Sequence, residues 1–197
     1  MITISNESVI WLRGNQCGLG PLRHDLVDLY WRWENELRVM TGNGRQTPES
    51  LDERTAGLDS QMRHSMNQAR FTIYDTTKDE PSPVGTTDLV IQHRWRTAEF
   101  FILLGEEGRG RGIGTEATRL ALDYAFHVTN LLNVYLTVLS PNTAAIRAYE
   151  KAGFRVIGER RQSGCWLGRR VSEVLMDAIP TDFPGPSVVS QVVEPTQ

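Results

Sequence analysis

A glycine-rich stretch lies between a short apolar run and a long amphipathic run, an order typical of an anion-binding loop. The apolar run is Phe100–Leu104, and four glycines follow within seven residues: Gly108, Gly110, Gly112 and Gly114. From Ala117 to Val128 the apolar residues recur at helical spacing. Glycine lets backbone N–H groups turn toward a ligand, and the first turn of a helix adds unpaired donors and a positive dipole end. We therefore expect a phosphate-bearing cofactor at this loop.

Two common phosphate-binding loops do not fit this stretch. A Walker loop requires Gly-Lys-Ser/Thr after the glycines, and that sequence is absent here. A dinucleotide fingerprint requires another glycine spacing and a parallel βαβ unit, whereas the chain before Phe100 is antiparallel in character. Residues Arg109–Gly114 read Arg-Gly-Arg-Gly-Ile-Gly, and they fit the pattern Arg/Gln-x-x-Gly-x-Gly/Ala.

A second motif follows at Asn142–Phe154, which reads Asn-Thr-Ala-Ala-Ile-Arg-Ala-Tyr-Glu-Lys-Ala-Gly-Phe. With both motifs in this order, the chain resembles the GCN5-related N-acetyltransferase (GNAT) family over about Val84–Ile179. The tryptophan-bearing helix near the start is similar to the RimJ/RimL branch of that family. The resemblance implies a GNAT fold, acetyl-CoA as cofactor, and transfer of acetyl to a primary amine by direct attack in a ternary complex.

The resemblance also implies how acetyl-CoA is held. The loop Arg109–Gly114 would bind the pyrophosphate through its backbone, with charge-assisted contacts from its two arginines. The pantetheine arm would pair with the backbone freed where two central strands splay apart. The predicted cofactor-binding residues are Ile102, Leu103, Leu104, Arg109, Gly110, Arg111, Gly112, Ile113, Gly114, Thr115, Asn142, Ala145 and Tyr149. Simpler roles stay open: solvated charge for the arginines, and helix N-cap for Asn142.

Tyr149 is the predicted general acid, because expulsion of a thiolate requires a proton and a phenol with a pKa of about 10 can donate one at close range. The alternative is a tyrosine that only packs in the core. Glu99 is the predicted general base, since it matches a recurrent acid of the RimJ/RimL branch. Asp88, His93 and bulk water are the other candidates for that role.

Composition excludes several classes of protein. The net charge of −3 gives no general case for nucleic acid binding, and two cysteines without CxxC spacing fit a reducing cytosol. The four histidines show no paired-ligand spacing, so we predict no metal site. The N-terminus lacks the pattern of a signal peptide and no apolar run approaches 18 residues, so we expect a cytoplasmic protein without a membrane partner.

The elements that must position these residues can be read in order. A hairpin, Val9–Leu12 with Leu19–Arg23, precedes one helix from Leu26 to about Leu37 and a second from Thr47 to about Asn67. Three antiparallel strands follow, then the central helix and a parallel strand at Val134–Leu139. We predict an α/β fold: a mixed, mostly antiparallel sheet of about seven strands flanked by helices, with splayed central strands. It would form one domain over residues 1–179, and the proline-rich residues 180–197 would form a mobile tail.

The acceptor is not defined by these motifs. A RimJ/RimL-like enzyme takes a protein N-terminus, whereas related members acetylate small amines such as polyamines, aminoglycosides or amino sugars. The resemblance also leaves a homodimer open. A rival function is a catalytically weak acyl-CoA-binding or sensing module on the same fold, which turnover with an amine would exclude.

Overall fold

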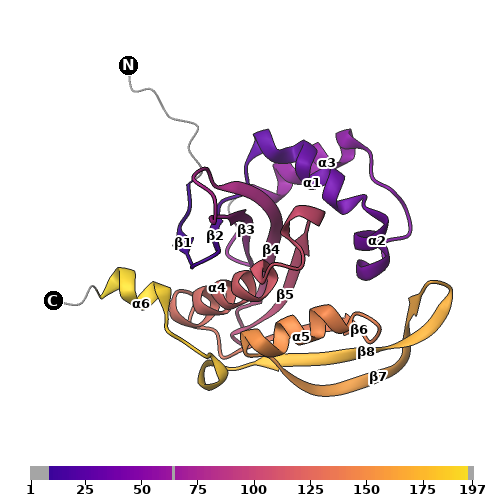
Figure 1. Ribbon diagram of the computed structural model, residues 1–197. Helices are drawn as coiled ribbons and strands as arrows, with labels where there is room; N and C mark the ends of the chain where they lie inside the picture. The colour runs from indigo at the N-terminus through magenta and orange to yellow at the C-terminus, as the bar shows by residue number, and fades with distance from the viewer. Residues whose placement is uncertain (1–8, 64, 195–197) are drawn as a thin grey trace.

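One mixed sheet organises the chain in the computed structural model, which describes residues 9–63 and 65–194 (Figure 1). The N-terminal eight residues of the predicted domain and the last three of the predicted tail lie outside the described residues. The strand order is β1-β2-β3-β4-β5-β6-β8-β7. The strands are β1 Leu12–Arg13, β2 Cys17–Gly20, β3 Gln68–Asp75, β4 Ser82–Gln92, β5 Thr97–Leu104, β6 Asn133–Leu139, β7 Arg155–Trp166 and β8 Arg169–Ala178. The described part of the sheet thus has eight strands rather than about seven, and β1 is too short to give a period-two signal.

The parallel pair β5 and β6 separates after three rungs. Thr97–Glu99 pair with Asn133–Tyr135, and beyond Glu99 the two strands make no further ladder contacts with each other. β4 pairs with β5 along its whole length on one side, and β8 pairs with β6 on the other side. The C-terminal halves of β5 and β6 therefore face each other with unused backbone donors and acceptors. This arrangement confirms the predicted mixed, mostly antiparallel sheet with splayed central strands.

Helices cover the sheet on both faces (Figure 1). α4 (Ile113–His127), α5 (Thr143–Ala152) and α6 (Val188–Val193) lie on one side, and α1 (Val27–Glu34), α2 (Leu37–Asn43) and α3 (Leu51–Gln61) lie on the other. Three short 3-10 turns complete the order: His24–Leu26, Glu106–Gly108 and Pro180–Asp182. Within the described residues, no helix is both long and apolar enough to cross a membrane.

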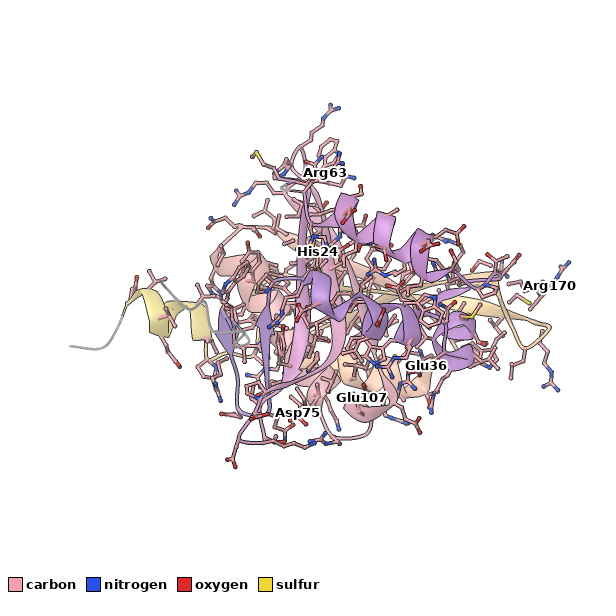
Figure 2. All side chains as sticks on the ribbon, turned by 90° about the horizontal axis from the view of Figure 1, so that it is seen from above. His24, Glu36, Arg63, Asp75, Glu107 and Arg170 are labelled. Atoms are coloured by element: carbon pink, nitrogen blue, oxygen red, sulfur yellow. The ribbon has the colours of Figure 1, made fainter. Side chains whose placement is uncertain are left out.

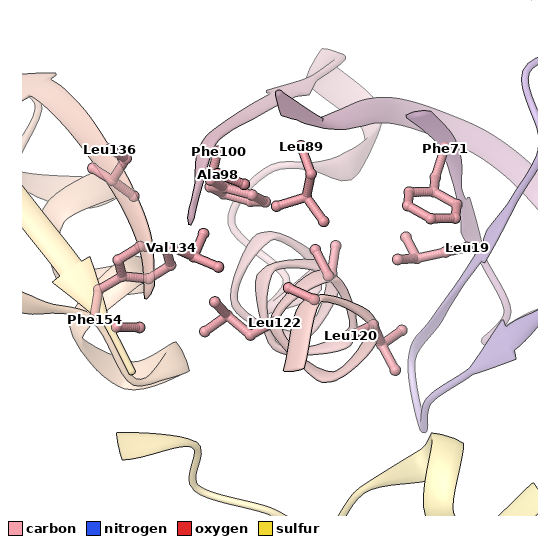
Figure 3. Close-up of a cluster of buried hydrophobic side chains, with 14 of the residues drawn as sticks. Leu19, Phe71, Leu89, Ala98, Phe100, Leu120, Leu122, Val134, Leu136 and Phe154 are labelled. Atoms are coloured by element: carbon pink, nitrogen blue, oxygen red, sulfur yellow. The ribbon is translucent and has the colours of Figure 1, made fainter. Parts of the chain in front are cut away.

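The main core lies between the sheet and α4 (Figure 3). Leu120 and Leu122 of α4 are buried against side chains of several strands, among them Leu19, Leu89 and Phe100. A smaller cluster on the opposite face contains Tyr30, Trp33 and Leu58, with Leu103 of β5 packed against it. Strand β5 therefore packs on both faces, which fixes its position beside the splay.

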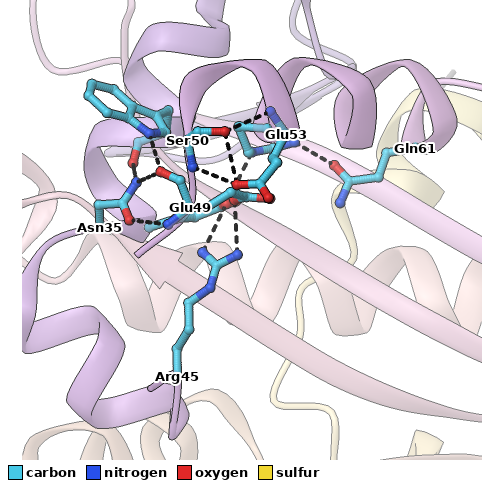
Figure 4. Close-up of polar contacts among 9 residues, drawn as sticks. Asn35, Arg45, Glu49, Ser50, Glu53 and Gln61 are labelled. Carbon is cyan, nitrogen blue, oxygen red and sulfur yellow. Dashed lines mark hydrogen bonds and ion pairs between the residues drawn. The ribbon is translucent and has the colours of Figure 1, made fainter. Parts of the chain in front are cut away.

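The first predicted helix is interrupted at Asn35 and Glu36. The Asn35 side-chain amide donates to Trp31 O (2.9 Å) and Glu49 O (3.1 Å), and its oxygen accepts from the Glu49 N–H at 2.9 Å (Figure 4). Leu37, predicted to continue the buried face, is 81% exposed. α3 begins at Leu51 rather than Thr47, because Ser50 and Glu53 form a capping box there.

Residues 180–194, for which the sequence predicts a mobile tail, pack on the domain through contacts with α4. Asp123 of α4 accepts hydrogen bonds from Ser187 Oγ (2.6 Å) and from the backbone N–H groups of Val188 (2.6 Å) and Val189 (3.2 Å). The Asp123 side chain is 1% exposed, and Val189 is buried. The sequence did not predict this anchor, because the four prolines within residues 180–197 indicated a tail. The residue that accepts these hydrogen bonds, Asp123, lies far earlier in the chain.

Asp123→Ala should therefore lower the free energy of unfolding by about 2–4 kcal/mol, because it leaves several buried donors unpaired. Urea unfolding measures this loss, and limited proteolysis should show faster cleavage between residues 180 and 194. Glu159→Gln, which removes an exposed carboxylate from β7, is the control and should leave both unchanged. An Asp123→Ala protein as stable and as resistant as the wild type would contradict the anchor.

Candidate active site

Two cavities of about 520 Å³ each meet at the splay between β5 and β6. The loop cavity is bounded by the glycine loop, the end of β5 and the start of α5. The arginine-lined cavity lies against α1, α3 and strands β3 and β4. Six residues line both: Val39, Asn43, Ile102, Leu103, Thr137 and Tyr149. The two cavities therefore adjoin at the splay, and we call this junction the passage.

The loop cavity has the features that a phosphate group requires. Gly110 and Gly112 adopt positive φ angles of 72° and 85°, which lets the loop turn tightly before α4. Gly112 is the N-cap of α4 and, having no side chain, leaves the N–H groups of the first helical turn uncapped by its own residue. At Gly114 an added Cβ would lie 3.1 Å from the Leu104 side chain, so a larger residue there would require Leu104 to shift. A phosphate-bearing ligand fits this cradle.

Most residues predicted to bind acetyl-CoA line the loop cavity. They are Ile102, Leu103, Leu104, Arg109, Gly110, Gly114, Asn142, Ala145 and Tyr149. Gly112, Ile113 and Thr115 do not line it, and the Ile113 side chain is fully buried in the core. These three residues lie at the N-cap and in the first turn of α4.

Arg111 is turned away from the cavity. Its Nη2 lies 2.7 Å from Asp75 Oδ2 and donates to the Thr77 hydroxyl at 3.1 Å. Burial alone would raise the pKa of the Asp75 carboxyl, but the hydrogen bonds from Thr77 and Arg111 outweigh it and hold that pKa below its ordinary value. Arg111 therefore joins the loop to the end of β3, a long-range partner that the motif does not indicate.

Arg109 does line the cavity, and it is also paired. Its Nη2 donates to Glu36 Oε2 and to the backbone oxygen of Leu104, each at 2.6 Å. Nearby, Trp33 Nε1 donates to Glu107 Oε1 at 2.9 Å, so α1 contacts the same loop. Trp33 is 3% exposed and lines neither cavity, so its role is to pack α1 on the sheet.

Tyr149 occupies the junction of the two cavities. α5 begins after Asn142, whose side-chain oxygen accepts from the Ala145 N–H at 3.3 Å, and ends at Gly153 with a φ of 117°. The Tyr149 ring meets Phe100 and Phe154 edge-on, with centroids 6.2 and 6.0 Å away. Burial raises the pKa of Tyr149 to about 12, so the phenol keeps its proton at neutral pH.

The arginine-lined cavity contains arginines that are matched by carboxylates. Arg54 Nε lies 3.1 Å from Glu34 Oε2, and Arg70 Nε lies 3.0 Å from Asp88 Oδ2. Arg45, which also lines this cavity, pairs with Glu49 at 2.9 Å (Figure 4). Burial raises the pKa values of Glu34 and Asp88, although the neighbouring arginines oppose the shift. The cavity is thus nearly balanced in charge.

The three candidate bases lie in different places. Asp88 lines the arginine-lined cavity, whereas Glu99 and His93 line neither cavity. Glu99 stands at the last paired rung of β5 and β6, opposite Tyr135. Burial, and then the charge of Glu99, raises the pKa of Tyr135. A ring nitrogen of His93 lies 2.7 Å from Met66 O, outside the passage.

Sequence reasoning missed most of the contribution of α2. Arg38, Val39, Gly42 and Asn43 line the loop cavity. It also missed the role of Glu116 in the first turn of α4. The Glu116 carboxylate accepts hydrogen bonds from the backbone N–H groups of Asn15, Gln16 and Cys17 at 2.7, 2.7 and 2.8 Å. The β1–β2 turn is thereby fixed to the start of α4.

Known acetyltransferases are similar to this chain in sequence. Residues 18–155 match the family model described as "Acetyltransferase (GNAT) domain". The chain is 34% identical over 142 residues to a spermidine N(1)-acetyltransferase of Escherichia coli (strain K12), which covers 72% of this chain and 74% of that protein. A spermidine N(1)-acetyltransferase of Vibrio cholerae is 32% identical over 121 residues, 61% of this chain and 68% of that protein.

A crystal structure of spermidine N-acetyltransferase from Vibrio cholerae in complex with CoA and spermine is similar in three dimensions. It superposes with a TM-score of 0.78 at 26% identity, covering 87% of this chain and all of that one (100%). The family model spans well over half of the chain. Residues of both sequence motifs, Arg109–Gly114 and Asn142–Phe154, line the loop cavity. The chain therefore belongs to the GNAT family of acetyltransferases.

Proposed function

We propose that this chain transfers acetyl from acetyl-CoA to a small primary amine, with polyamines such as spermidine as the first acceptors to test. As a member of the GNAT family it is an acetyl-CoA-dependent N-acetyltransferase. The observation that carries the proposal is the passage through the splay, with Tyr149 lining both cavities. Donor and acceptor can approach each other there from opposite faces of the sheet.

The loop cavity is the proposed donor site. Arg109, Gly110, Gly114 and the first-turn N–H groups of Ile113 and Thr115 would bind the pyrophosphate. The Leu104 carbonyl accepts from Arg109, and the other backbone groups of Ile102–Leu104 that face β6 are available to the pantetheine arm. Asn142 and Ala145 would bound that arm from α5. Arg111 and Gly112 would act by shaping the loop, through the ion pair with Asp75 and the positive φ angle.

Bound acetyl-CoA would supply the acetyl group as a thioester. The arginine-lined cavity would present the amine, whose nitrogen bonds to the carbonyl carbon while the carbon–sulfur bond breaks. Tyr149 would donate its phenolic proton to the departing sulfur and regain one from solvent. A carboxylate, Asp88 directly or Glu99 through water, would accept the proton that the amine loses. Only Asp88 lines the cavity, so its position favours it.

The names of the relatives favour a polyamine over a protein N-terminus as acceptor. The RimJ/RimL-like assignment would favour the N-terminus, and the two acceptors are distinguished by experiment. We place the reaction in the cytoplasm, where acetyl-CoA is available.

An acceptor screen tests the function. CoA release from acetyl-CoA is measured with spermidine, spermine, amino sugars, aminoglycosides and short peptides with free N-termini. Turnover that depends on an amine supports the proposal, and the best acceptor names the class. Binding of CoA by calorimetry without turnover on any amine would favour the rival sensing module instead.

Tyr149→Phe should lower kcat about 10–1000-fold while the Kd for CoA stays within about twofold, because only the acidic proton is lost. Steady-state kinetics and calorimetry measure the two quantities. Since burial raises the pKa of Tyr149 to about 12, the wild-type rate should not fall through ionisation of this phenol below about pH 11. Unchanged kcat in Tyr149→Phe would remove the acid role from this residue.

Asp88→Asn and Glu99→Gln compare the two carboxylates as bases. The variant that removes the true base should have a kcat/KM about 100-fold or more below that of the wild type, and the other variant should lose much less. If Asp88 is the base, the acid limb of the wild-type pH profile should lie above the ordinary pKa of aspartate, because burial raises the pKa of this group. Thermal unfolding is the control for the loss of the Arg70–Asp88 ion pair. Small losses in both variants would leave water as the proton acceptor.

A further inference from the structure

We propose that Glu36 is an internal competitor for the phosphate-binding side chain of the donor site. Glu36 would occupy Arg109 in the free protein, and a donor phosphate would displace it. The proposal rests on the proposed function, because it takes acetyl-CoA as the ligand of the loop cavity. It assigns to Glu36 control over donor affinity, a role that neither sequence motif contains.

The first observation is the position of the Arg109 guanidinium. Its Nη2 is shared between Glu36 Oε2 and Leu104 O, both at 2.6 Å. Glu36 competes with a donor phosphate for the Arg109 cation. Arg109 in turn occupies the Leu104 carbonyl group at the end of β5, which would otherwise be open toward β6. The two side chains of the ion pair are 24% and 29% exposed, so a ligand in the cavity can reach them.

The second observation is the scarcity of free positive charge in the loop. Arg111 is held by Asp75, whose side chain is 1% exposed, and it does not line the cavity. Arg109 is thus the loop cation that faces the ligand, and the Glu36 carboxylate neutralises it. Phosphate accepts charge-assisted hydrogen bonds from arginine strongly, which allows a polyanionic donor to win the exchange.

The third observation is that Glu36 can move without disturbing a core. It lies on the extended connection between α1 and α2, with φ −62° and ψ 128°. The following helix α2 contains no buried residue, whereas the preceding helix is held by buried Trp33. Figure 2 labels Glu36 and Glu107, and Trp33 donates a hydrogen bond to Glu107. Val39 and Asn43 of α2 line both cavities, so displacement of Glu36 would also let α2 adjust around both substrates.

The test is Glu36→Gln, with Glu106→Gln as a charge-matched control. Glu106 is exposed, belongs to the same loop and makes no side-chain contact with Arg109. Calorimetry with CoA should give a Kd about 3–10-fold lower for Glu36→Gln and less than about twofold lower for Glu106→Gln. With pantetheine, which has no phosphate, the two variants should match the wild type. The KM for acetyl-CoA should fall while the acceptor KM stays nearly unchanged, and kcat should not rise.

A second variant keeps the test independent of folding effects. Glu36→Asp retains the charge but withdraws the carboxylate from Arg109, so its CoA affinity should lie between those of the wild type and Glu36→Gln. Unchanged or weaker CoA binding by a folded Glu36→Gln protein would overturn the proposal, as would equal tightening by Glu106→Gln. Wild-type protein that binds no CoA at all would instead contradict the proposed function on which this inference rests.

Discussion

The loss of pairing between β5 and β6 after Glu99 is the constraint on which the site depends. Two neighbouring strands that diverge leave backbone groups without partners, and such groups are costly unless a ligand or water satisfies them. The divergence is stable because each strand is held on its outer side, β5 by β4 over eight rungs and β6 by β8 over six. The fold therefore maintains an opening at its centre without relying on flexible loops.

Packing on both sides of β5 turns this opening into a passage with two distinct entrances. Side chains of β5 alternate between the α4 core, where Phe100 is buried, and the opposite cluster around Trp33, where Leu103 packs. Tyr149 reaches the opening because α5 starts at the end of β6 and is stopped at Gly153, with its ring held by Phe100 and Phe154. The same core that stabilises the sheet thus positions the proposed acid.

Local signals predicted the parts of the structure that depend on local chemistry. The glycine loop, α4, α5 and the strands around them were all recognisable, because spacing and capping residues determine them directly. The break at Asn35 depends on Glu49, the orientation of Arg111 depends on Asp75, and the anchoring of α6 depends on Asp123. Each of these is a polar contact between distant segments, which periodicity cannot reveal. The resemblance to the RimJ/RimL branch predicted Glu99 as the base, whereas Asp88 is the candidate that lines the arginine-lined cavity.

The Glu36–Arg109 pair has a further consequence for turnover. Acetyl-CoA and CoA carry the same phosphates, so binding energy from the phosphates stabilises substrate and product alike and does not lower the barrier of the chemical step. Excess affinity of this kind slows product release, which limits many enzymes that bind their ligands tightly. A carboxylate that competes for Arg109 reduces this uniform binding, while the contacts at the thioester, where the bond changes occur, are untouched. The ion pair would therefore favour turnover at the expense of donor affinity, and Tyr149, at the junction of the cavities, would retain its full effect on the reaction.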